Sequence, residues 1–100
     1  MLAVAVLVGC AAPQTQTARG VLLDVVSPGI QQVTSFTLRT DAGEEMHFVT
    51  APDFNAGATH VMTPGHMRQH MALADPVLVT YRVDNGQLVA LSAADVTPPN

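Results

Sequence analysis

The sequence predicts a mainly β domain of five short strands, with a single helix between the third and the fourth strand. Three observations support this prediction. Apolar and polar residues alternate with a period of two over residues 33–40 and 44–50, as in strands with one buried face. Two short turn signals, residues 41–43 and 84–86, separate strand-like segments. Residues 63–75 have the start and stop signals of a helix.

The first three strands are expected at residues 20–26, 33–40 and 44–50. The first is an aliphatic, mostly β-branched run that is apolar on both faces for much of its length, which is typical of a central or barrel strand. The second and third strands place Phe36 and Phe48 on their apolar faces. The connection that follows the third strand is expected to be a surface loop.

The helix is expected between a good N-cap residue and a proline stop. The side-chain oxygen of Thr63 can accept a hydrogen bond from a free backbone N–H of the first turn. Pro64 occupies the first helical position, where its missing N–H costs nothing. The helix should end at Asp75, because proline at position 76 disfavours helical backbone at the preceding residue. On a wheel of about 100° per residue, His70 lies near the centre of the apolar arc, so this face should close one end of a barrel.

The last two strands are expected at residues 75–83 and 87–93, joined by an Asn-Gly turn. The fourth strand places Val77, Val79, Tyr81 and Val83 on one face.

This order of elements, over residues 18–96, resembles the OB-fold, a five-stranded Greek-key barrel. The strand SFTLRT and the helix TPGHMRQHMA are similar to segments of small, uncharacterised bacterial envelope proteins. We therefore expect an OB-like β-barrel domain at residues 19–96. The resemblance implies that a ligand would bind on the face of the second and third strands, and here that face consists of Ser35, Thr37, Arg39 and His47.

Residues 1–9 form an uncharged apolar run that is too short to span a bilayer but fits the apolar core of a signal peptide. Its end, Leu7-Val8-Gly9-Cys10, resembles the lipobox of bacterial lipoproteins. That resemblance implies cleavage before Cys10, a lipid-anchored cysteine, a tether over residues 10–18, and a domain outside the cytoplasm in the cell envelope or periplasm. A plain signal peptide or a buried free cysteine are the alternatives. Residues 97–100 should form a disordered tail.

Composition argues against two classes of function. The net charge is −4 with four Lys and Arg residues in total, which disfavours a nucleic-acid partner. The sequence also lacks a nucleophile elbow, a glycine-rich phosphate loop and a Cys-x-x-Cys pair, so we do not expect an enzyme. The preferred hypothesis is a non-catalytic module without a cofactor, which binds a small ligand or an unknown envelope protein or acts structurally, with the membrane as its anchor at Cys10.

The alternative hypothesis is periplasmic binding of Cu or Zn. His66 and His70 are four residues apart, so both project from one side of a helix, and this spacing can hold two ligands of one ion. His60 and Met62, just before the helix, are candidates for the remaining ligands. The competing structural interpretation has His70 facing the barrel and bonded to a backbone group, and the sequence alone favours that interpretation.

Overall fold

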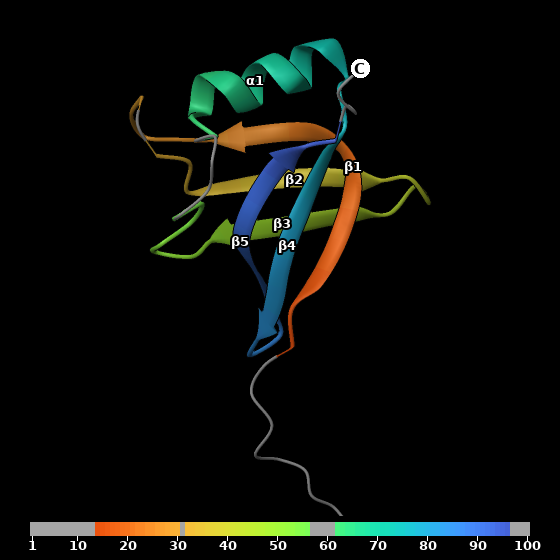
Figure 1. Ribbon diagram of the computed structural model, residues 1–100, viewed down its shortest axis with the longest axis vertical. Helices are drawn as coiled ribbons and strands as arrows, with labels where there is room; N and C mark the ends of the chain where they lie inside the picture. Colours follow the sequence, from red (N-terminus) through yellow and green to blue (C-terminus); the bar gives the residue numbers. More distant parts are fainter. Residues whose placement is uncertain (1–13, 31, 57–61, 97–100) are drawn as a thin grey trace, which may run out of the picture.

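The computed structural model describes residues 14–30, 32–56 and 62–96. Its elements in chain order are β1 (Gln16–Val26), β2 (Ser35–Thr40), β3 (Glu45–Thr50), α1 (Pro64–Leu73), β4 (Val77–Asp84) and β5 (Gln87–Asp95). The strands close into a barrel in the order β1-β2-β3-β5-β4 (Figure 1). This is the predicted mainly β, OB-like barrel, with its helix between β3 and β4. Within the described ranges, no helix has the length and apolarity needed to cross a bilayer.

Strand β1 pairs with two neighbours, and this closes one side of the barrel. Its first part is antiparallel to β4 and its second part is antiparallel to β2. The change of partner occurs at Gly20, which pairs with both Val77 and Thr40. A Cβ atom at Gly20 would lie 2.0 Å from the carbonyl oxygen of Arg39, so only glycine fits this corner. A short parallel pair between β3 and β5 completes the barrel.

The inward faces of the strands form one apolar core. Phe36 and Phe48 are fully buried, as predicted, and their ring centroids lie 5.2 Å apart. The ring centroids of Phe48 and Tyr81 lie 5.1 Å apart in an edge-to-face arrangement. Of the four residues expected on one face of β4, Val77, Val79 and Tyr81 are buried, whereas Val83 is 46% exposed. Strand β1 pairs with β4 only as far as Tyr81, so Val83 lies beyond the barrel wall in the β4–β5 hairpin.

Helix α1 lies across one end of the barrel (Figure 1). The predicted N-cap is confirmed, because Thr63 Oγ1 accepts a hydrogen bond from the backbone N–H of His66 at 3.1 Å. The helix ends at Leu73, slightly before the expected residue 75. Ala74 adopts a left-handed conformation with φ 54°, and the backbone N–H groups of Ala74 and Asp75 close the last turn by donating to helix carbonyls.

Several strand boundaries differ from the expected ones, and β1 and β5 are longer than expected. Strand β1 begins at Gln16, so part of the segment expected to be a tether pairs with β4 instead. Strand β5 continues to Asp95, two residues beyond its expected end at Ala93. The predicted signal peptide, Cys10 and the tail at residues 97–100 lie outside the described residues.

Candidate metal centre

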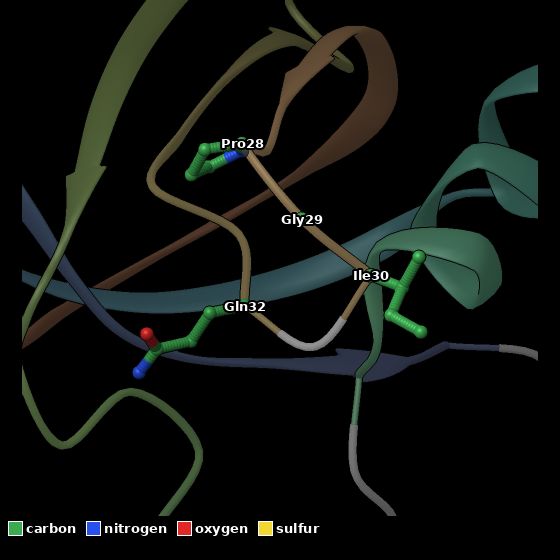
Figure 2. A pocket seen from close by; sticks show the side chains of 4 residues that line it. All are labelled: Pro28, Gly29, Ile30 and Gln32. Carbon is green, nitrogen blue, oxygen red and sulfur yellow. The ribbon is translucent and has the colours of Figure 1, made fainter.

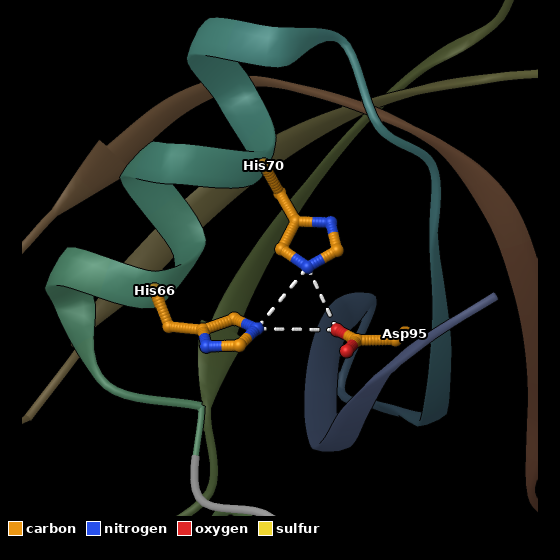
Figure 3. Close-up of side chains that lie close together, drawn as sticks. All are labelled: His66, His70 and Asp95. Carbon is orange, nitrogen blue, oxygen red and sulfur yellow. Dashed lines mark hydrogen bonds and ion pairs between the residues drawn. The ribbon is translucent and has the colours of Figure 1, made fainter. Parts of the chain in front are cut away.

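Three side chains meet between the helix and the end of strand β5: His66, His70 and Asp95 (Figure 3). The Nε2 atoms of the two histidines are 3.2 Å apart. The Oδ1 atom of Asp95 lies 3.2 Å from Nε2 of His66 and 2.7 Å from Nε2 of His70. One oxygen and two imidazole nitrogens therefore form a compact triangle, which we call the His-His-Asp triangle.

Helix α1 supplies the two imidazoles. Residues four apart in a helix lie one above the other on the same face, and the rings of His66 and His70 stack with centroids 4.9 Å apart and planes inclined by 28°. Both Nε2 atoms point from the helix toward the end of β5 (Figure 3). The spacing recognised in the sequence thus brings the two histidines together as expected.

Strand β5 supplies the carboxylate because of a β-bulge. The register between β4 and β5 shifts by one residue between Thr80 and Tyr81, where β5 contains the extra residue Leu91. Beyond this shift Asp95 pairs with Val77, which is fully buried, so both side chains lie on the inward face of the sheet. A shift of one residue exchanges the two faces of a strand. Without the bulge, the carboxylate of Asp95 would therefore face outward.

A backbone carbonyl fixes the orientation of His70. Its Nδ1 atom lies 3.3 Å from the carbonyl oxygen of Asp75, and this oxygen can only accept, so Nδ1–H is the donor. The backbone N–H of Asp75 in turn donates to the carbonyl of His70 at 2.9 Å. The Nε2 atom is thereby directed into the triangle. Histidines that bind metal ions commonly donate their other ring N–H to a carbonyl or carboxylate in this way.

The triangle is electrostatically favourable for a positive charge at its centre. Burial raises the pKa of Asp95, but in the metal-free protein the hydrogen bond with His66 and the attraction of the protonated forms of His70 and His66 outweigh that effect and hold the pKa below its ordinary value of 3.8. Asp95 is therefore an anion at neutral pH. A carboxylate and two basic nitrogens at such short distances require a proton or a metal cation between them.

The dimensions of the triangle suit a transition-metal ion. Metal–ligand bonds of about 2.0–2.2 Å separate ligand atoms by about 3.3–3.6 Å at tetrahedral angles and by about 2.8–3.1 Å at right angles. The observed separations of 3.2, 3.2 and 2.7 Å lie close to these two ranges. Small movements of the Asp95 carboxylate would bring all three atoms to bonding distance of one ion.

The structure distinguishes among the ligands predicted from sequence. His66 and His70 belong to the cluster, whereas His60 lies outside the described residues. Met62 is 5% exposed and packs in the apolar core, so its side chain has a packing role. Asp95 was missed. The Asn-Gly turn could have indicated its position. Because β4 and β5 pair outward from this turn, the end of β5 lies opposite the start of β4.

The face predicted to bind ligands lies on the outside of β2 and β3. Thr37 pairs with His47, and Thr37 Oγ1 lies 3.0 Å from His47 Nδ1. Arg39 pairs with Glu45, and Ser35 pairs with Val49. The four predicted residues therefore occupy one stretch of the sheet, and their role in ligand binding stays a prediction.

A shallow pocket opens at the loop between β1 and β2 (Figure 2). Its lining consists of Pro28, Gly29, Ile30 and Gln32, and the side chain of Ile30 extends away from the loop. None of these four residues has an ionisable side chain. The described part of this lining therefore offers no acid or base, in contrast to the His-His-Asp triangle.

No protein-family model matches this chain, and no curated protein matches it. Among solved structures, apo-CusF residues 6–88 from Escherichia coli has a similar fold, with a TM-score of 0.59. The alignment covers 90% of this chain and 96% of that chain, at 14% sequence identity. At this identity the similarity concerns the fold alone. The chain therefore shares the five-stranded barrel with a solved bacterial protein, and the triangle has to be interpreted from its own geometry.

Proposed function

We propose that this protein binds one divalent transition-metal ion through His66, His70 and Asp95. The observation that supports this most strongly is the convergence of two imidazole nitrogens and one carboxylate oxygen within 3.2 Å of one another. The metal-binding alternative from the sequence therefore becomes the preferred function, with Asp95 in place of the expected His60 and Met62.

The donor atoms favour Zn²⁺ or Cu²⁺. Two imidazole nitrogens and one carboxylate oxygen are ligands of borderline hardness, which suit these ions, whereas Cu⁺ prefers thiolate and thioether sulfur. The nearest thioethers in the sequence are those of the helix and its preceding residues. Met62 and Met67 are 5% and 0% exposed and belong to the apolar core, and the partly buried Met71 packs against it. Ligation by these sulfur atoms would require the side chains to leave their packing positions.

The shared fold gives modest additional support. The similar solved structure is named as an apo form, the term for a protein without its bound ligand. A protein with a similar barrel is thus described by its ligand-free form, and this agrees with a binding role for the present protein. We infer a non-catalytic role, since a metal carrier or sensor needs only the ligands themselves.

We further propose that the protein acts in the bacterial cell envelope as a lipoprotein. The support is the apolar run that ends at Cys10, which is the single cysteine of the chain. The Cys10→Ala variant should leave the membrane fraction of the native host, because the acyl chains supply the membrane affinity. Membrane association that persists in this variant would contradict the proposed anchor.

Metal binding can be tested by equilibrium dialysis and elemental analysis. The parent for this experiment is the full chain with Cys10→Ala, which removes the only thiolate that could bind the ion. We expect one Zn²⁺ or Cu²⁺ per chain, and loss of the ion in a variant that combines His66→Ala with His70→Ala. The matched histidine variant, His47→Ala, should retain the ion, because His47 lies on β3 and pairs with Thr37. Equal metal content in all three proteins would refute the proposed site.

A further inference from the structure

We propose that the metal centre is an open site, in which the three protein ligands leave one coordination position for a small monodentate anion from solution. This inference rests on the proposed metal binding and goes further by naming the chemical class of a second ligand.

The exposure of the three ligands is uneven. The side chain of His70 is 9% exposed, so it covers the inner side of the triangle. The side chains of His66 and Asp95 are 38% and 47% exposed and form its outer side. An ion bound by all three atoms would therefore be shielded on the side of the barrel and accessible on the side of solvent.

Three of the described histidine and carboxylate side chains supply ligands to this site. Among their histidines, aspartates and glutamates, the group that could hold an ion consists of His66, His70 and Asp95. The side chain of Met67, on the same helix, is fully buried in the core. Zinc sites with three protein ligands keep a further position for water or another small ligand, whereas structural zinc sites use four protein ligands.

Charge selects an anion for the open position. A divalent ion with one carboxylate and two neutral imidazoles has a net charge of about +1, so an anionic fourth ligand would neutralise it. Among the described residues, the carboxylate grouped with the two histidines is that of Asp95, which is already a ligand. Asp75, just after the helix, contributes its backbone carbonyl to Nδ1 of His70. The small anions that fit this description include carboxylates, halides and azide.

Cobalt and azide provide the test. Co²⁺ takes the place of Zn²⁺ with similar ligands, and its visible absorption depends on its coordination. The Cys10→Ala chain is loaded with Co²⁺, dialysed, and titrated with sodium azide while bound cobalt is measured. We expect a saturable spectral change that corresponds to one azide per Co²⁺, with the cobalt still bound to the protein. The Asp84→Asn variant, which alters an exposed aspartate in the distant β4–β5 hairpin, should respond in the same way.

Three results would overturn the inference. The first is bound Co²⁺ whose spectrum does not respond to azide, and the second is removal of Co²⁺ from the protein by azide. The third is a spectrum that responds to azide in the His60→Ala variant but not in the parent, which would mean that His60 fills the fourth position. The first and third results leave the proposed metal binding intact, whereas absence of any bound Co²⁺ refutes both proposals.

Discussion

At the scale of single residues, His66 and His70 have different roles although they lie on one face of the same helix. His70 is buried and its Nδ1–H is directed to the carbonyl of Asp75. His66 is more exposed, and its Nε2 contacts are those to the other two members of the triangle. We therefore assign His70 a structural contribution as well as a ligand role, and His66 mainly a ligand role.

This difference predicts unequal losses of stability without metal. His70→Ala should lower the free energy of unfolding by about 1–3 kcal/mol, because it removes a buried hydrogen-bonding partner. His66→Ala should lower it by less than about 1 kcal/mol, because its side chain is partly solvated. Urea denaturation with a chelator present measures both values. Equal losses in the two variants would contradict the assignment.

Asp95 should make the stability of the metal-free protein depend on pH. Burial raises its pKa, but the histidines outweigh burial and lower the pKa below its ordinary value. Because the pKa of Asp95 is lower in the folded protein than in the unfolded chain, where it is about 3.9, the carboxylate stabilises the fold at pH values above about 3.9. This stability is lost as the pH falls through the pKa of Asp95 in the folded protein. Because Asp95 is substantially exposed, solvent screening limits the effect to less than about 1 kcal/mol.

The comparison of the parent with Asp95→Asn isolates this effect. The difference in the free energy of unfolding should be largest above about pH 5, where the carboxylate is charged in both the folded and the unfolded chain, and should shrink toward about pH 3. Denaturation curves in chelator at each pH give the difference. A difference that stays constant over this range would show that the carboxylate charge has no role in the fold.

The sequence predicts part of the site for a clear physical reason. Helical spacing is local, so the meeting of His66 and His70 follows from their separation along the chain. The position of Asp95 depends on two non-local facts, the pairing of β5 with β4 and the bulge at Leu91 that turns its carboxylate inward. A bulge leaves little signal in a single sequence, and Asp95 also lies beyond the apolar run that marks β5.

At the scale of elements, the end of β5 is held by a turn as well as by strand β4. After its parallel pairing with β3 ends at Ala90, the free edge of β5 meets the turn that contains Asn55. Asn55 Oδ1 accepts a hydrogen bond from the backbone N–H of Ala93 at 2.8 Å. The backbone N–H of Asn55 donates to the carbonyl of Leu91 at 2.9 Å. This contact fixes the strand two residues before Asp95.

Substitution of Asn55 should therefore weaken this part of the barrel. Asn55→Gly leaves the backbone free to keep its φ of 62° but removes the side-chain acceptor, at a cost of about 1–3 kcal/mol. Asn55→Ala should cost about 1 kcal/mol more, because alanine disfavours the left-handed conformation. Thermal or urea denaturation gives both values. If Asn55→Gly matches the parent, the side-chain contact contributes nothing.

The elements themselves were predictable where the apolar pattern is regular. Phe36 and Phe48 mark the inward faces of β2 and β3, and Thr63 and Pro64 mark the start of α1. The early start of β1 was missed, because residues 16–18 are small and polar like a linker. They become a strand because β4 offers them an edge, and that partner is remote in the sequence.

At the scale of the whole molecule, a metal ion would join two elements that have no covalent connection near the site. The triangle links α1 to the end of β5, and the helix otherwise packs mainly on β1. An ion that binds only the folded protein stabilises it by mass action. Occupancy of the site should therefore strengthen the attachment of the helix to the barrel.

We expect Zn²⁺ to raise the free energy of unfolding by about 2.7 kcal/mol when the free ion is at 100 times its dissociation constant. The same Zn²⁺ concentration should leave the stability of the variant with His66→Ala and His70→Ala unchanged. Chemical denaturation at a buffered free-metal concentration measures the effect. Equal stabilisation of the parent and this variant would place the ion elsewhere on the protein.

X-ray absorption spectroscopy of the Zn²⁺-loaded chain with Cys10→Ala identifies the atoms that bind the ion. We predict a first shell of nitrogen and oxygen at about 2.0–2.2 Å, with the outer-shell scattering of two imidazoles, and the loss of that scattering in the variant with His66→Ala and His70→Ala. A sulfur shell at about 2.3 Å, or an imidazole signal that survives the double substitution, would contradict the proposed centre.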